Sequence, residues 1–365
     1  MPVLGTSGCG SGGSRHSSAA DHAATPLAIS TYNSKSALDN FPQRVTSFLL
    51  ILSPLLLDTP VSPIYTIMAQ DPRALLQKAQ KQLQSAGGGF SFFGGREDKY
   101  QEAADLFIQA GNAFKMQQQS THLPLYLEAG KAFEQAAQVQ TDKLKEPDDA
   151  ANTLVDAFKA YRKDDPQAAA KCLNVAVDRY CAKGNFRRAA SHKENLGELY
   201  EVDLGDAKSA IESYELAATW YEGDNAAALA NKLWLKVADV AAIEGDYYKA
   251  IEKYEKVAEQ SINNNLMKYS VKDYLLKAGI CHLASGDLVA AQRALEKYRD
   301  MDPSFGAQRE HQLLTDLCEA IEARSQEQFT DRLYQFDQIS KLDKWKTTIL
   351  VRVKNQIEEA DDEFA

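Results

Sequence analysis

GDYYKAIEKYEKVA, at residues 245–258, decides the fold, because similar phrases recur along the chain. GDAKSAIESYELAA begins 40 residues earlier at Gly205, and GDLVAAQRALEKY begins 41 residues later at Gly286. A weaker copy, DPQAAAKCLNVAV, begins at Asp165. A fixed period in this range is typical of stacked helical hairpins, in which each hairpin buries its apolar face only against its neighbours. The repeat therefore predicts an all-α array of the tetratricopeptide-like type, a right-handed superhelix whose extended surface binds other proteins.

Small and aromatic residues recur at fixed places in these hairpins. Alanines are expected where helices touch, since two helices approach to about 8 Å only where side chains are small. Tyr214, Tyr254 and Tyr298 follow them and are expected to fill the space between hairpins as core residues. Glycine, proline and aspartate mark the breaks. These breaks and the apolar spacing predict helices at about 71–83, 98–116, 122–140, 148–163, 166–182, 185–202, 206–221, 225–243, 246–262, 266–284, 287–299, 304–323, 325–338 and 342–358.

The pattern also divides the chain into regions. Residues 1–67 carry Gly/Ser clusters and no helical period, so we expect either a disordered extension or a mispredicted start, with translation beginning at Met68. Residues 68–302 form the predicted hairpin array, with a Phe-rich loop at 85–95. The forty-residue rhythm fails after Pro303, so we expect residues 303–358 to form a helical bundle that closes the array, followed by an acidic tail at 359–365.

The composition is that of an ordinary folded but acidic protein. Of the 365 residues 44% are hydrophobic and 25% are charged, and the formal net charge is −10. General nucleic-acid binding is disfavoured, because phosphate neutralisation needs a dominant basic surface. The five cysteines include no CxxC pair, so we expect small core residues in a reducing compartment rather than disulfides or metal ligands.

No catalytic or cofactor-binding pattern is found in the sequence. The glycine-rich stretch at 87–95 lacks the Lys-Ser/Thr of a nucleotide-binding loop. The six histidines show no metal-ligand spacing, and no nucleophile elbow occurs. We therefore expect no enzymatic activity, no cofactor and no metal, which favours an adaptor.

Three features are candidates for binding. Phe90, Phe92 and Phe93 lie in the loop SAGGGFSFFGG, where they either dip into a lipid interface or tuck back under the neighbouring helices. A set of basic residues on alternate helices forms either a track for an acidic, elongated partner or ordinary surface charge paired locally. Its members are Arg187, Arg188, Lys193, Lys232, Lys236, Lys268, Lys272 and Arg309.

The third feature is the acidic C-terminal end, which is either solubilising or directed at a basic partner. Glu319 and Glu322 lie on the predicted bundle and extend this acidic end. The end itself consists of Glu358, Glu359, Asp361, Asp362 and Glu363, followed by Phe364 and Ala365.

Several strings in the chain match a known family. They are GGGFSFFGG (87–95), AADLFIQAGNAFK (103–115), YEVDLGDAKSAIESYELAATWYEGD (200–224), ANKLWLKVADVAA (230–242), KYSVKDYLLKAGICHL (268–283) and ISKLDKWKTTILVRVKNQI (339–357). In this order they resemble the soluble NSF attachment proteins of the alpha type. The resemblance covers Met68 to Ala365, and residues 1–67 have no counterpart.

The resemblance implies an adaptor that recruits the hexameric ATPase NSF to assembled SNARE four-helix bundles of the syntaxin type. NSF then disassembles the bundles for reuse in vesicle fusion. It also implies a cytoplasmic protein peripherally associated with membranes through the Phe loop. The family's SNARE-contacting basic positions match Lys232, Lys236, Lys272 and Arg309. Asn185 and Ser191 stand where the family often has basic residues, so Arg187, Arg188 or Lys193 are the substitutes.

The resemblance assigns the acidic end to NSF. Glu319 and Glu322 match acidic positions that meet the NSF N-domain, whereas Ala323 stands where an acid is common. Phe364 stands in place of the family's penultimate Leu, which is tied to stimulation of the ATPase. An alternative function is a co-chaperone that clamps C-terminal peptides. It would require a 34-residue period and a compact basic clamp, whereas the period here is near forty.

Overall fold

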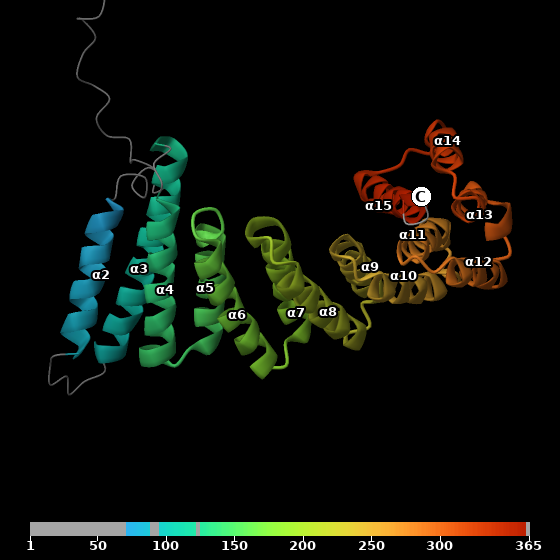
Figure 1. Ribbon diagram of the computed structural model, residues 1–365. Coiled ribbons are helices and arrows are strands. Elements are labelled where there is room, and N and C mark those ends of the chain that lie inside the picture. Colours follow the sequence, from blue (N-terminus) through green and yellow to red (C-terminus); the bar gives the residue numbers. More distant parts are fainter. Residues whose placement is uncertain (1–70, 88–94, 122–124, 363–365) are drawn as a thin grey trace, which may run out of the picture. The chain divides into compact units, whose positions relative to one another are not determined.

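The computed structural model describes residues 71–87, 95–121 and 125–362 (Figure 1). Regular structure within these ranges is entirely helical, and the helices belong to one compact unit. They are α2 (Pro72–Gly87), α3 (Gly95–Thr121), α4 (Tyr126–Val139), α5 (Pro147–Tyr161), α6 (Pro166–Ala182), α7 (Phe186–Glu198), α8 (Ala207–Gly223), α9 (Ala227–Glu244), α10 (Tyr247–Ser261), α11 (Val271–Ala284), α12 (Leu288–Met301), α13 (Arg309–Glu322), α14 (Gln326–Asp337) and α15 (Lys344–Asp362).

Four short segments extend these helices. They are the π-helical turns η1 (Gln140–Leu144) and η2 (Leu199–Leu204), and the 3-10 turns η3 (Lys268–Ser270) and η4 (Phe305–Ala307). Each α-helix packs on the next one along the chain (Figure 1). The predicted all-α array of helical hairpins is therefore confirmed, and most predicted helix ends differ from the observed ones by a few residues.

The aspartate of the recurring phrase caps the start of a helix in each repeat. Asp165, Asp206, Asp246 and Asp287 each precede a helix, and each carboxylate accepts a hydrogen bond from the backbone N–H three residues later, at 2.8–3.1 Å. Such N-caps satisfy an otherwise unpaired N–H at the start of the helix. The glycine before three of these aspartates adopts a positive φ, between 65° and 89°, which side chains disfavour. The Gly-Asp pair thus ends one helix and starts the next.

The tyrosines of the repeat are core residues, as predicted. Tyr214, Tyr254 and Tyr298 are at most 2% exposed. Each hydroxyl donates a hydrogen bond to a carboxylate elsewhere in the array: Tyr214 to Glu201 at 2.8 Å, Tyr254 to Asp239, and Tyr298 to Glu255 at 2.8 Å. A buried hydroxyl needs such an acceptor. Burial also raises the pKa of all three tyrosines.

Three of the four cysteines in the described ranges are core residues, as predicted. Cys172, Cys281 and Cys318 are buried, Cys181 is half-buried, and all four are free thiols. Cys9 lies outside the described residues.

Glycine inside α7 permits a close helix contact. A Cβ at Gly197 would lie 2.5 Å from a ring carbon of Tyr214. That ring is buried and held by its hydrogen bond to Glu201, so it has little room to move. Gly130 against Tyr161 and Gly279 against Leu314 repeat this arrangement.

Gly197→Ala is therefore expected to lower the free energy of unfolding by about 1–3 kcal/mol, the usual cost of overpacking, although alanine is the better helix former. Urea denaturation followed by circular dichroism measures this. Gly223→Ala is the matched control, because no atom lies within 4 Å of its Cβ position. An equal effect of both substitutions would contradict the close-contact explanation.

The last helix departs from the regular order. Besides α14, α15 contacts α9 and α11, which lie more than 60 residues earlier in the chain. Arg352 of α15 donates hydrogen bonds to the carbonyl oxygens of Ala242 (3.3 Å) and Ile243 (2.8 Å), in the last turn of α9. Gln356 donates to the carbonyl of Ala284, the last residue of α11, at 3.0 Å. Helix α15 thus supplies donors to carbonyls in the last turns of α9 and α11; the carbonyl of Ala242 also accepts from the backbone N–H of Gly245 at 3.1 Å. The predicted division at residue 302 stays a prediction.

Candidate functional site

The candidate site is a groove lined by residues of α7, η2, α8, α9, the segment before η3 and the beginning of α11, with a volume of about 670 Å³. Lys232 and Lys236 face this groove together, because residues four apart lie on one side of a helix. Apolar side chains such as Val202, Met267 and Tyr274 also line it. Its charged residues are Glu194, Glu198, Glu201, Lys232, Lys236 and Asp239.

Both lysines are paired with carboxylates of the preceding hairpin. Lys232 Nζ lies 2.8 Å from Glu194 Oε1, and Lys236 Nζ lies 2.7 Å from Glu201 Oε1. The hydrogen bond to Glu194 raises the pKa of Lys232. The lysine side chains are 68% and 42% exposed, whereas both glutamates are only 25% exposed. The local pairing that the sequence left open as an alternative is therefore present here, and the groove carries four carboxylates beside two ammonium groups.

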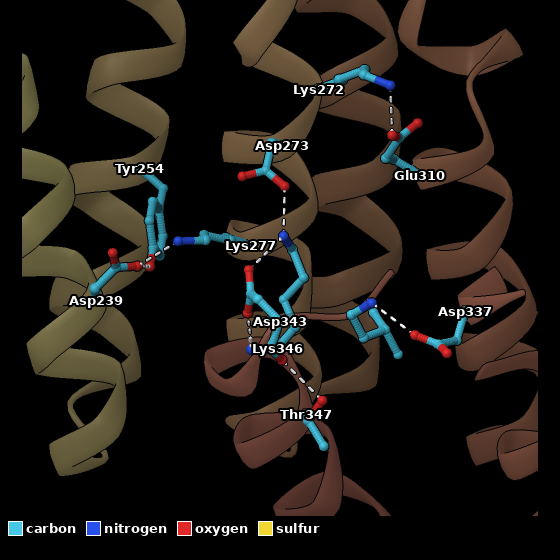
Figure 2. A network of polar contacts seen from close by, with 11 residues as sticks. Asp239, Tyr254, Lys272, Asp273, Lys277, Glu310, Asp337, Asp343, Lys346 and Thr347 are labelled. Carbon is cyan, nitrogen blue, oxygen red and sulfur yellow. Dashed lines mark hydrogen bonds and ion pairs between the residues drawn. The ribbon is translucent and has the colours of Figure 1, made fainter. Parts of the chain in front are cut away.

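The other carboxylates of the groove have partners as well. Glu198 lies 3.0 Å from Arg162, the residue that follows α5. Asp239 Oδ1 lies 2.7 Å from Lys277 Nζ of α11 and also accepts from Tyr254 (Figure 2). Trp345 of α15 donates its indole N–H to the backbone carbonyl of Asp239 at 2.9 Å. Asp239 thus joins α9 to α10, α11 and α15.

A second ionic cluster holds α15 against α11. Lys346 is buried and lies between Asp273 (2.7 Å) and Asp343 (3.0 Å), as Figure 2 shows. Burial alone would lower the pKa of Lys346, but these two carboxylates raise it. Residues 343–346 therefore anchor the start of α15.

The basic residues of α11 and its preceding turn point elsewhere. Lys272 Nζ lies 2.7 Å from Glu310 Oε1 of α13 (Figure 2). Lys268 lies in η3, where its Nζ is 3.4 Å from Asn265 Oδ1 and 5.4 Å from the ring centre of Tyr269. Neither residue lines the groove of Lys232 and Lys236.

The basic residues of α7 contact α6 and α8. Arg187 pairs with Asp224 at 2.8 Å, and the Arg188 guanidinium lies 4.6 Å from the ring centre of Tyr180. Lys193 donates to Asn174 at 3.2 Å, and burial lowers the pKa of Lys193. These partners lie on α6 and directly after α8, not on α9.

Arg309, at the start of α13, contacts the region of α14. Its guanidinium donates to Ser340 at 3.1 Å and lies 5.6 Å from the ring centre of Phe336. Of the predicted basic set, the structure thus brings only Lys232 and Lys236 together in the groove. Glu194 and Glu201, which sequence reasoning missed, complete it. They lie 38 and 35 residues before their lysines, about one repeat away, and that spacing was the available signal.

The acidic set lies partly outside the described residues. Glu319 and Glu322 are exposed on the C-terminal half of α13. The side chains of Glu358, Glu359, Asp361 and Asp362 are not described, although the backbone there forms the end of α15. Glu363 and Phe364 lie outside the described residues, as do Phe90, Phe92 and Phe93, which follow α2 and precede α3.

Among the helices of residues 71–87, 95–121 and 125–362, none combines the length and the apolar character of a membrane span. In the same ranges, no group of three or more His, Cys, Asp or Glu side chains is placed to hold a metal ion.

Comparison with known proteins gives consistent matches. Residues 70–358 match the family described as "Soluble NSF attachment protein, SNAP". A "Probable vesicular-fusion protein sec17 homolog" from Neurospora crassa is 57% identical over 298 residues, which are 82% of this chain and 100% of the relative. A protein of the same description from Schizosaccharomyces pombe is 50% identical over 297 residues, 81% and 100% of the two chains. The "Alpha-soluble NSF attachment protein" of Homo sapiens is 38% identical over 291 residues, 80% and 96% of the two chains.

Proposed function

Because the chain belongs to the soluble NSF attachment protein family, we propose that it is an adaptor that binds assembled SNARE complexes and recruits the ATPase NSF to disassemble them in vesicle-mediated transport. The observation that carries this proposal is the family match, which spans residues 70–358 and so includes nearly all of the described helices. The adaptor is not itself an enzyme. The alternative, a peptide-clamping co-chaperone, gains no support from relatives named as vesicular-fusion and NSF attachment proteins.

The SNARE bundle binds along α9, the helix that carries Lys232 and Lys236. An elongated, acidic four-helix rod suits exposed ammonium groups at the rim of a groove, where charge raises the rate of association and sets the register. Lys268, Lys272, Arg309, Arg187, Arg188 and Lys193 provide further contacts along the rod. The bundles in this proposal are SNARE complexes of the syntaxin type.

NSF binds the acidic end. Glu319 and Glu322 are exposed on α13. This helix lies within residues 303–358, the region predicted to close the array. The residues Glu358, Glu359, Asp361, Asp362, Glu363 and Phe364 extend this end. Glu319 and Glu322 lie on α13, whereas Lys232 and Lys236 lie on α9, so NSF and the SNARE bundle meet different helices and can be bound at once.

Assembly of the three components tests the proposal. Size-exclusion chromatography of NSF, held in its ATP state without hydrolysis, and a soluble SNARE bundle should show co-elution only when this protein is added. Glu319→Lys with Glu322→Lys should abolish the entry of NSF into the complex while SNARE binding persists. Co-elution of NSF and SNAREs without the adaptor, or no complex with it, would refute the proposed function.

The Phe loop attaches the adaptor to membranes. Three phenylalanines among glycines are an apolar anchor, and a second weak site raises the apparent affinity for membrane-bound SNAREs by tethering. The protein is then cytoplasmic and peripherally associated with membranes.

Phe92→Ser with Phe93→Ser is expected to lower disassembly of liposome-bound SNARE complexes by at least about tenfold, because tethering a second site can raise the apparent affinity by about 10²–10⁴-fold. Disassembly of the same complexes in detergent should change less than twofold. Leu266→Ser is the control, because Leu266 is an exposed apolar residue, 90% accessible, outside this loop. An equal loss in liposomes and detergent would remove the membrane role.

A further inference from the structure

The lysines of the groove are engaged before any partner arrives. Glu194 holds Lys232 at 2.8 Å and Glu201 holds Lys236 at 2.7 Å. Both glutamates come from the preceding hairpin, from α7 and η2, so each ion pair crosses a boundary between hairpins. An acidic partner can reach these ammonium groups fully only by taking them away from internal carboxylates.

In each ion pair, the glutamate side chain is less exposed than the lysine side chain. Glu201 also accepts the hydroxyl hydrogen of the buried Tyr214 at 2.8 Å through its second oxygen. The glutamate side chains are 25% exposed, whereas those of Lys232 and Lys236 are 68% and 42% exposed. The long lysine side chains are therefore the parts that can swing toward a partner, and the carboxylates remain behind.

We propose that Glu194 and Glu201 compete internally with the acidic partner for Lys232 and Lys236 and thereby set the affinity of the groove. The inference rests on the proposed function, since it concerns binding of the SNARE bundle. Binding becomes an exchange of ion pairs rather than a simple gain of them. After the exchange, the two carboxylates lie close to an acidic surface, beside Glu198 and Asp239, and repel it.

An exchange has a distinct dependence on salt. Salt weakens the internal pairs and the intermolecular pairs alike, so the two effects partly cancel and the affinity of the wild-type protein falls only slowly with ionic strength. Without the internal carboxylates only the intermolecular attraction is screened. The affinity should then be higher at low salt and fall more steeply.

The test is Glu194→Gln with Glu201→Gln, which keeps the shape of both side chains and an acceptor for Tyr214. We expect Kd for a soluble SNARE bundle, measured by biolayer interferometry, to fall by about two- to tenfold at low salt, in keeping with the modest strength of exposed ion pairs. The slope of log Kd against log salt concentration should become steeper. Thermal unfolding verifies that the variant is folded.

The matched control is Glu215→Gln with Glu259→Gln. These glutamates lie on α8 and α10, pair with Lys249 (3.4 Å) and Lys297 (3.9 Å), and do not line the groove. This control changes the net charge equally and should leave the salt slope unaltered. Equal effects of both double variants, or unchanged or weaker binding of Glu194→Gln with Glu201→Gln, would overturn the inference. Failure of the wild-type protein to bind the bundle would instead refute the proposed function.

Discussion

Reversing the charge of Lys232 and Lys236 together is expected to raise Kd for the assembled SNARE bundle by at least about tenfold. The groove already holds four carboxylates, and the double change Lys232→Glu with Lys236→Glu would leave six with no cation among its lining residues. Each change replaces an attraction with a repulsion toward an acidic partner, mainly slowing association. A loss of 1.4 kcal/mol in binding free energy is a factor of ten. Binding at one fixed salt concentration measures the effect.

The control for this variant is Lys131→Glu with Lys208→Glu. Both lysines are exposed and lie on α4 and α8, outside the groove. The control produces the same change of net charge and should alter Kd less than threefold. If the SNARE complex is pulled down equally by the wild-type protein and by the groove variant, the groove is not the binding surface.

Replacing Glu255 by glutamine is expected to cost about 3 kcal/mol of stability at pH 7 and only a small fraction of that near pH 2. Glu255 lies on α10, where its carboxylate lies 2.6 Å from Lys297 Nζ, 2.8 Å from the Tyr298 hydroxyl and 3.7 Å from His282 Nε2. Burial raises the pKa of Glu255, but these three neighbours outweigh burial and lower the pKa from 4.5 to about 2. A shift of one pKa unit corresponds to about 1.4 kcal/mol.

The sign of the pH dependence follows from that lowered pKa. The charged carboxylate stabilises the folded chain fully above pH 4.5, and this contribution is lost as the pH falls from 4.5 toward 2. Glutamine resembles the protonated acid, so the difference between wild type and Glu255→Gln should shrink over the same interval. Urea denaturation at pH 7, 4.5 and 3 measures it.

Glu259→Gln is the control for Glu255→Gln. Glu259 lies on the same helix and 3.9 Å from the same Lys297, but its side chain is 56% exposed. Its substitution should change stability by less than about 0.5 kcal/mol. A wild-type protein whose advantage over Glu255→Gln stays constant between pH 7 and pH 3 would contradict the assigned role of the buried carboxylate.

The parts of the fold that were predictable from the sequence are local. The Asp206 and Asp246 carboxylates cap backbone groups three residues away, and Gly205 and Gly245 adopt the positive φ that ends the preceding helix. Because these contacts are local, the residues that make them recur at a fixed spacing in the sequence. The contact between α15 and α9 has no such sequence pattern, because Arg352 donates to the carbonyl of Ile243, 109 residues away in the chain.

In the candidate site, too, local features were predictable from the sequence and contacts between helices were not. That Lys232 and Lys236 share a face follows from helical spacing alone. That Arg187 and Lys193 turn toward Asp224 and Asn174 depends on how neighbouring helices meet, which periodicity does not specify. The pairing of Lys232 with Glu194 was open to prediction only by comparing positions one repeat apart.

NSF-driven disassembly of SNARE complexes tests the central claim most directly. Fluorescence dequenching of a labelled SNARE bundle in the presence of NSF and ATP should be rapid with the wild-type protein and negligible without it. Lys232→Glu with Lys236→Glu should slow it at least about tenfold at subsaturating protein, in line with the expected loss of binding. Disassembly that proceeds equally with and without this protein would contradict the account.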